Sequence, residues 1–81
     1  MIVAIAIRFA GQVYSMPKPA KHLHLMLEWI DKLPDIDTGI KGFLDDKGNF
    51  LTRAEAGIHA LTCGQVAGLP TFRQFQSDDL W

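Results

Sequence analysis

The stretch from Gly42 to Ala56 constrains the fold more than any other part of the sequence, because it specifies a strand, a turn, a second short strand and a helix start without interruption. Residues 45–48 read Asp-Asp-Lys-Gly, the turn formers and final glycine that a tight reversal needs, and apolar residues flank them. Thr52 precedes Glu55 by three residues, the spacing at which the hydroxyl and the carboxylate each satisfy a backbone N–H group of the other residue. The stretch therefore predicts a β-hairpin that leads into an α-helix.

The N-terminal half predicts a second hairpin followed by a helix. Residues 2–9 alternate large β-branched residues with small apolar ones, so both faces are apolar and we expect a central strand. Residues 12–16 return as its antiparallel partner. A helix is expected over residues 19–33, where the first proline suits an initial turn and Pro34 ends the helix. Its predicted core face comprises Leu23, Met26, Leu27, Ile30 and Leu33.

A second stripe, formed by His22, Leu25 and Trp29, lies beside that predicted core face. Together the two stripes form an apolar arc wider than a small sheet can cover, so we expect Leu25 and Trp29 to be partly exposed. Tryptophan is enriched at the energetic centres of protein interfaces. We interpret Leu25 and Trp29 as a candidate protein-binding patch, with an ordinary edge of the core as the alternative.

The C-terminal half predicts a second helix over residues 52–63 and a short tail. The helix is expected to bury Ala54, Ile58 and Leu61, and Gly57 beside them would let it approach the sheet closely. Residues 71–76 could add an edge strand, and residues 77–79 could begin one last turn. The element order is strand, strand, helix, strand, strand, helix. It predicts a single α+β domain over residues 1–81, with two helices packed on a four-stranded antiparallel sheet.

Composition and charge narrow the function classes. Eight basic and nine acidic residues give a net charge of -1, which favours neither a nucleic-acid-binding protein nor a mimic of DNA. The single Cys63 cannot form an internal disulfide, which is typical of a reducing cytoplasm. The apolar residues 1–7 are too few to span a bilayer and have no basic region before them. We expect a cytoplasmic protein with no membrane partner.

The histidines and the cysteine are weak candidates for metal binding or catalysis. His22 and His24 are two residues apart on a helix, so they point to different sides. Glu55, His59 and Cys63 share one face, but a zinc site would need ligands from elsewhere. Cys63 lies near a helix C-terminus, where the dipole disfavours the thiolate that a nucleophile requires. We therefore predict no enzyme, no metal and no cofactor.

Four further residues are candidates for a binding surface because tyrosine, tryptophan and arginine dominate interface hot spots. They are Arg8, Tyr14, Arg53 and Trp81. Each also has a structural interpretation: Arg53 as a solvated residue of the first helical turn, for example, and Trp81 as an anchor for the C-terminus.

The whole chain resembles small accessory proteins of tailed phages and prophages. The resemblance rests on short motifs spread over nearly all of the sequence: Ala6-Ile7-Arg8, Gly11, Tyr14, Pro17, Pro19, His22, Gly42-Phe43-Leu44-Asp45, Gly48, Phe50-Leu51-Thr52-Arg53, Glu55-Ala56, Gly64-Gln65 and Ser77-Asp78-Asp79-Leu80-Trp81. It implies a phage or mobile-element origin and transfers no catalytic residue.

The leading functional hypothesis is an anti-defence protein that acts by stoichiometric binding, most plausibly an anti-CRISPR inhibitor of a CRISPR-Cas effector. A first alternative is a protein that sequesters a nucleotide or other small immune signal, with Arg8, Tyr14, His22 and Arg53 around a pocket at an oligomer interface. A second alternative is a structural or regulatory phage protein. The expected partner is a bacterial defence complex, and a second copy of the chain is the other partner considered.

Overall fold

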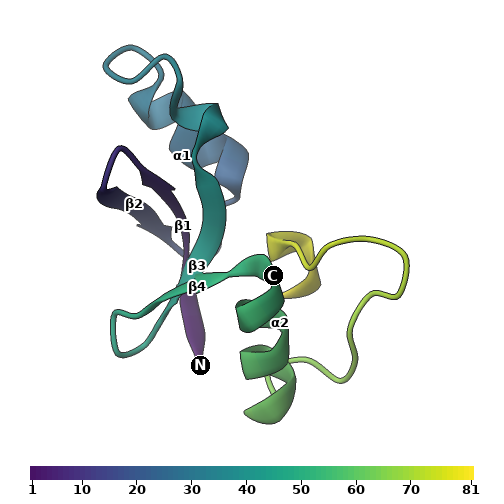
Figure 1. The fold of residues 1–81 in the computed structure, drawn as a ribbon. Helices are drawn as coiled ribbons and strands as arrows, with labels where there is room; N and C mark the ends of the chain where they lie inside the picture. The colour runs from purple at the N-terminus through teal and green to yellow at the C-terminus, as the bar shows by residue number, and fades with distance from the viewer.

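The computed structural model describes all 81 residues and confirms the α+β fold, with one antiparallel sheet and two helices (Figure 1). The strands are β1 (Ile2–Phe9), β2 (Gln12–Pro17), β3 (Ile40–Asp45) and β4 (Phe50–Thr52), the α-helices are α1 (His22–Trp29) and α2 (Arg53–Thr62), and the short 3-10 helices are η1 (Ile36–Thr38) and η2 (Ser77–Asp79).

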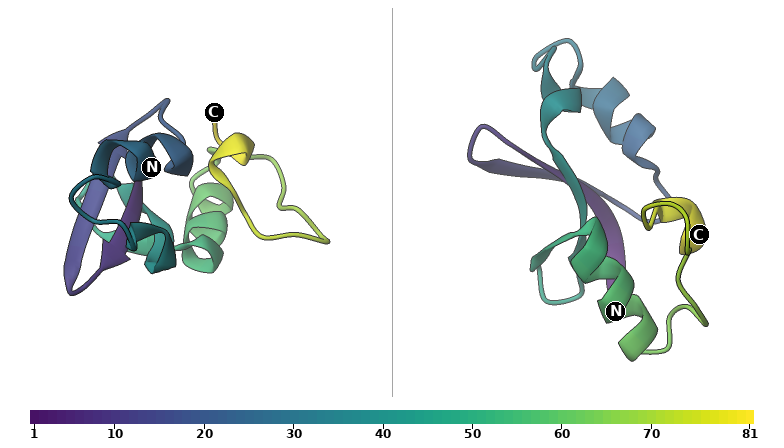
Figure 2. Two further views of the ribbon diagram at one scale, coloured as in Figure 1. Left: turned by 90° about the horizontal axis from the view of Figure 1, so that it is seen from above. Right: turned by 45° about the vertical axis from the view of Figure 1, so that its right-hand side comes forward.

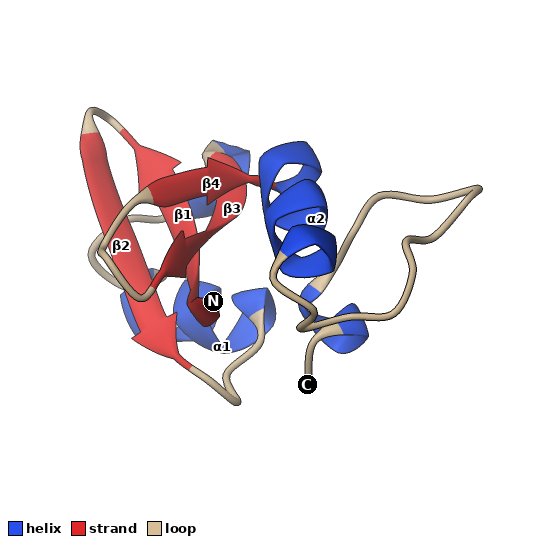
Figure 3. Cartoon of the chain, turned by 90° about the horizontal axis from the view of Figure 1, so that it is seen from below, coloured by secondary structure: helices blue, strands red, loops and turns tan.

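The sheet has the strand order β2-β1-β3-β4, so β1 is one of the two central strands, as its two apolar faces predict. Ile5 pairs with Met16 of β2 and with Phe43 of β3. Both helices lie on the same side of the sheet (Figures 2 and 3). The structure therefore has two layers, with one sheet face covered by helices and one face free of them.

The core lies between the sheet and the helices, and Phe43 is at its centre. The Phe43 ring packs edge-on against His22 of α1, with 5.2 Å between centroids, and against Phe75 of the C-terminal segment, with 5.7 Å. One cluster thus joins both helices and the tail to the central strands. Its buried members are Ile2, Ile5, Ile7, Leu25, Ile36, Phe43, Ala56, Ala60 and Phe75.

On the sheet face that carries no helix, two side chains cover part of the strands. Ala6 is fully buried there and pairs across the sheet with Gly42. A Cβ atom at Gly42 would lie 2.7 Å from the Phe50 ring, so this ring lies directly over the glycine. The Arg8 guanidinium lies 5.0 Å from the centre of the same ring, within the range of a cation–π contact. A ring and a cation therefore shield this part of the sheet instead of a helix.

A side-chain amide completes the hydrogen bonding at the start of β1. The register between β1 and β3 shifts between Ile2 and Ala4. Gln65, just after α2, accepts from the Ile2 N–H at 2.8 Å and donates to the Ile2 carbonyl at 2.9 Å. The Gln65 amide therefore bonds this residue as the backbone of a neighbouring strand would, and it ties the end of α2 to the sheet.

The hairpin and helix start predicted for residues 42–56 are confirmed. One Asp45 carboxylate oxygen accepts from the backbone N–H groups of Lys47 and Asn49, which stabilises the turn. These hydrogen bonds, that of Asn49 foremost, lower the pKa of Asp45 below its ordinary value. Thr52 and Glu55 form the expected reciprocal cap, with distances of 3.3 Å and 2.9 Å.

The predicted core face of the first helix is only partly correct: Met26 and Leu33 pack against the core, and the other three residues do not. The helix is shorter than expected, from His22 to Trp29, and it buries the His22 and Leu25 stripe instead. Leu25 is fully buried, so its expected exposure is wrong, whereas Trp29 is half-buried. Three residues of the predicted core face are exposed: Leu23, Leu27 and Ile30. Both stripes have helical spacing, so contacts with residues distant in the sequence determine which stripe is buried.

The buried side of the second helix is also wrong in detail. α2 buries the small residues Ala56, Gly57 and Ala60, and Ile58 and Leu61 face outward. Small side chains let a helix pack close to its neighbours. Gly57 permits a close approach, but of the tail and not of the sheet, because a Cβ atom there would lie 3.3 Å from Leu69 and 3.4 Å from Phe75.

The edge strand expected over residues 71–76 does not form. The segment from the end of α2 to η2 is a loop that extends away from the sheet, seen clearly in Figure 1. An Arg73–Asp79 ion pair closes it, and this pair lowers the pKa of Asp79 to about 2. The final turn is confirmed as η2. Trp81 then donates from its indole N–H to the carbonyl of Ala20 at 2.9 Å, so it anchors the C-terminus next to α1.

Substituting Gly42 tests the close contact between β3 and β4. In Gly42→Ala the new methyl group would lie 2.3 Å from the backbone oxygen of Leu51, so we expect the free energy of unfolding to fall by about 2–3 kcal/mol. Gly68→Ala is the control, because no atom lies within 4 Å of its Cβ position; its effect should stay below about 1 kcal/mol. Urea unfolding measures both, and equal stabilities of the two variants would contradict the close contact.

Candidate functional site

The outer face of α1 presents a row of large apolar side chains to solvent. Leu23, Leu27 and Ile30 are spaced by four and three residues and are 58%, 63% and 40% exposed. This spacing places them on one side of the helix, one turn apart. Glu28 and Asp31 follow Leu27 by one and four residues, and neither forms an ion pair. We call Leu23, Leu27 and Ile30 the α1 stripe.

The inner face of α1 explains why this stripe faces outward. His22 is buried, and its Nε2 lies 2.8 Å from the backbone oxygen of Gly42, so the ring donates a hydrogen bond to β3. Burial lowers the pKa of His22 below its ordinary value, and the charges of Arg53 and Lys41 lower it further. The neutral imidazole is thus a satisfied core residue and not a surface ligand.

At the other end of α1, Trp29 packs edge-to-face on Tyr14 of β2, with 4.8 Å between ring centroids. The Lys32 ammonium lies 5.8 Å from the same indole. Trp29 and Tyr14 therefore hold α1 on the sheet as a pair. The structure thus brings these two predicted site residues together, and both pack against the core cluster that contains Leu25.

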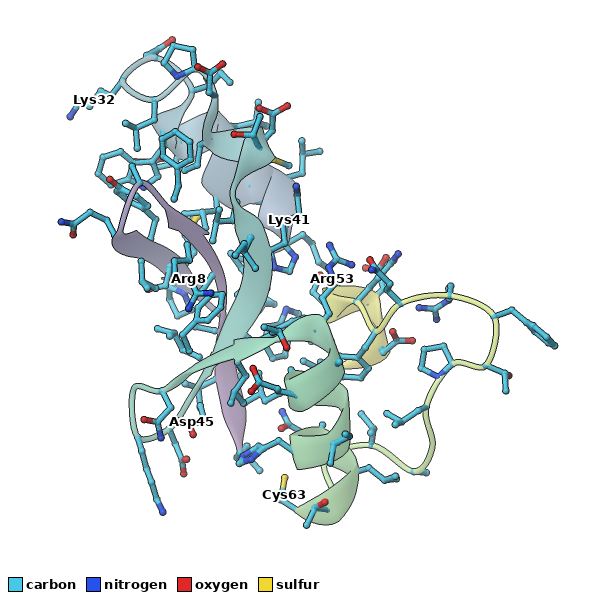
Figure 4. All side chains as sticks on the ribbon, in the orientation of Figure 1. Arg8, Lys32, Lys41, Asp45, Arg53 and Cys63 are labelled. Atoms are coloured by element: carbon cyan, nitrogen blue, oxygen red, sulfur yellow. The ribbon has the colours of Figure 1, made fainter.

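A hollow of about 690 Å³ opens between β3, the start of α2 and the C-terminal segment. Lys41 and Arg53 line it from two different elements, and both project toward the space between α1 and the N-terminal end of α2 (Figure 4). The hollow is lined by Gly39, Ile40, Lys41, Thr52, Arg53, Ala54, Gln74 and Gln76.

The pocket predicted around Arg8, Tyr14, His22 and Arg53 is only partly assembled. Arg53 lines the hollow, and His22 is near enough for its pKa to respond to Arg53. Arg8 instead lies over the Phe50 ring, and Tyr14 packs against Trp29. Their placement at this pocket was wrong for two different reasons. Arg8 follows Ile7, the partner of Lys41, so alternation turns it to the other face of the sheet. Tyr14 shares the face of Lys41 but lies on β2, at the opposite edge of the sheet from β3 and β4.

The predicted metal and nucleophile candidates lie apart from this hollow. His59 contacts the N-terminal amine, with Nε2 and N 3.2 Å apart, and the thiol of Cys63 donates to the carbonyl of Ala60 at 3.6 Å. No three His, Cys, Asp or Glu side chains are grouped so that they could hold a metal ion together. Neither α-helix has the length and hydropathy needed to cross a membrane.

Comparison with known families identifies the chain's origin. The family described as phage T4 y16D protein matches residues 1–81, the entire chain. The chain belongs to this phage protein family. The expected kinship with small phage accessory proteins is thereby confirmed. No curated protein and no solved structure matches the chain.

Two features of this T4 y16D family member were missed from the sequence. The α1 stripe was assigned to the core, because its leucines and isoleucine are more apolar than a stripe that contains a histidine. The hollow was missed because its lining residues come from β3, α2 and the tail, which are far apart in the sequence. Lys41 and Arg53, each half-buried and without an ion-pair partner, carried no local signal of their convergence.

The buried His22 predicts a specific pH dependence of stability. Between pH 6.5 and the lowered pKa, the unfolded chain binds a proton that the folded chain does not, so the free energy of unfolding falls as the pH falls. In His22→Gln the amide can still donate to Gly42 but does not titrate. Urea unfolding at about pH 7.5 and about pH 5.5 should show a smaller stability difference for the variant than for the wild type. Equal differences would contradict the buried neutral state of His22.

Proposed function

We propose that this phage protein acts by stoichiometric binding to a protein of a bacterial defence system, with a CRISPR-Cas effector as the foremost target. The observation that carries the proposal is the α1 stripe. Leu23 and Leu27 of the eight-residue helix and Ile30, the residue that caps its C-terminus, all stand in water, which forfeits hydrophobic stabilisation that a partner would supply.

The dimensions of the protein suit this role. A stable interface buries about 800 Å² on each partner. The chain exposes 5022 Å² in all, so one face that includes α1 can provide this area. An amphipathic helix that lays its apolar side into a groove of the partner is a common recognition mode, read through residues at this spacing.

Charge favours a target that handles nucleic acid. Glu28 and Asp31 are close in sequence to the α1 stripe and have no cationic partner within the chain. An apolar row with an acidic border complements a cationic surface that has an apolar centre. Effectors that hold guide and target nucleic acids need cationic surfaces, so a CRISPR-Cas effector meets this requirement.

Substitution of Leu27 tests the proposal. The wild-type protein, expressed in bacteria that carry a targeting CRISPR-Cas system, should restore plating of the targeted phage. Leu27→Glu should abolish this protection, because a carboxylate in the centre of an apolar contact leaves a buried, unpaired charge. Efficiency of plating across hosts with different CRISPR-Cas types measures the effect and identifies the target.

Ile58→Glu is the matched control. Ile58 has the same exposed fraction as Leu27, 63%, but lies on α2. Both variants should keep the wild-type free energy of unfolding within about 0.5 kcal/mol, and Ile58→Glu should keep full protection. Full protection by Leu27→Glu would exclude the α1 stripe. Protection only in a host whose defence uses a nucleotide signal would favour sequestration of that signal, and no protection in any host would favour a structural or regulatory role.

A further inference from the structure

The hollow at the start of α2 collects positive charge without neutralising it. Lys41 and Arg53 both line it, and neither forms an ion pair. Lys41 donates only to the backbone carbonyl of Asp37 at 2.8 Å, and Arg53 only to that of Phe75 at 3.4 Å. By contrast, Lys21 pairs with Asp78 and Arg73 with Asp79 close by.

The lining of the hollow contains two cations and no carboxylate. The first turn of α2 forms one wall. The Thr52 hydroxyl already accepts from the Glu55 N–H, but no side chain accepts from the N–H groups of Arg53 and Ala54, which favours an anion there. The Glu55 carboxylate of this turn accepts a hydrogen bond from the Thr52 N–H and does not line the hollow. The charge of the cavity is therefore positive on the sides that a ligand would contact.

The size and the remaining donors define the ligand further. The hollow is open to solvent, and its volume of about 690 Å³ leaves room for a small molecule. Gln74 and Gln76 each add a side-chain amide that can donate and accept hydrogen bonds. Ile40 and Ala54 supply apolar contact. This combination suits a molecule with an anionic group at one end and a polar group at the other.

We infer that this hollow is a binding site for a phosphorylated small molecule of nucleotide size, with Lys41 and Arg53 holding the phosphate. Arginine and lysine from separate elements converge on a phosphate as charge-assisted donors. The site does not include the α1 stripe, so it is independent of the protein-binding function proposed above.

The test is a titration of the purified full-length protein, followed by backbone and side-chain amide NMR signals. The probes are inorganic phosphate, nucleoside monophosphates and the matching uncharged nucleosides. We expect a monophosphate to shift the signals of Thr52, Arg53 and Ala54 and the side-chain amides of Gln74 and Gln76. Inorganic phosphate should shift the α2 signals more weakly, and the nucleosides should shift none.

Variants separate this site from general attraction to positive charge. Lys41→Gln and Arg53→Gln should each weaken binding about tenfold or more, while Lys47→Gln, at the exposed β3–β4 turn, should bind as the wild type. Urea unfolding checks that each variant folds. Absence of shifts with every monophosphate, or affinities that both site variants leave unchanged, would overturn the inference. If inorganic phosphate and the monophosphates shifted the NMR signals equally, the hollow would be a site for simple anions. That result would overturn the assigned ligand class.

Discussion

The pairing of β1 with both β2 and β3 is the constraint on which the rest of the structure depends. Ile5 and Ile7 point into the core, and Ala4 and Ala6 occupy the opposite face, so every side chain from Ala4 to Ile7 is buried. An antiparallel strand that is buried on both faces needs other parts of the chain to cover each face. The helices cover one face, while Phe50 and Arg8 shield the narrow, small-residue strip on the other.

The same constraint determines which helix faces remain free. The helix-covered side already receives large side chains from β1 and β3, so α2 meets it with alanine and glycine, and α1 meets it with Leu25 and a hydrogen-bonded His22. Other large aliphatic residues are therefore turned outward: Leu23 and Leu27 of α1, and Ile58 and Leu61 of α2. Of the two outward faces, that of α1 has an acidic border without internal partners, whereas the loop that follows α2 brings Leu69 against Gly57. The difference favours α1 as the surface for a protein partner.

The local signals in the sequence were sufficient for the element order and for the hairpin with its helix cap, because these depend on residues a few positions apart. Thr52 and Glu55 are an example, as are the turn formers around Asp45. Local signals could not predict which side of each helix is buried. His22 lies on the buried side because its ring forms a hydrogen bond with the Gly42 carbonyl. Trp29 lies on that side because its ring packs against Tyr14 of the N-terminal hairpin. The hollow depends in the same way on Lys41 and Arg53, which only the folded chain brings together.

The central claim is that the outward face of α1 is reserved for a partner other than the chain itself. Sedimentation equilibrium of the wild-type protein, from micromolar to millimolar concentration, tests it most directly. The account predicts a monomer of 9.0 kDa throughout, since the acidic borders of two such faces would repel each other. A dimer that Leu27→Glu converts to monomers, and that Ile58→Glu does not, would contradict it, because the α1 stripe would then be covered by a second copy.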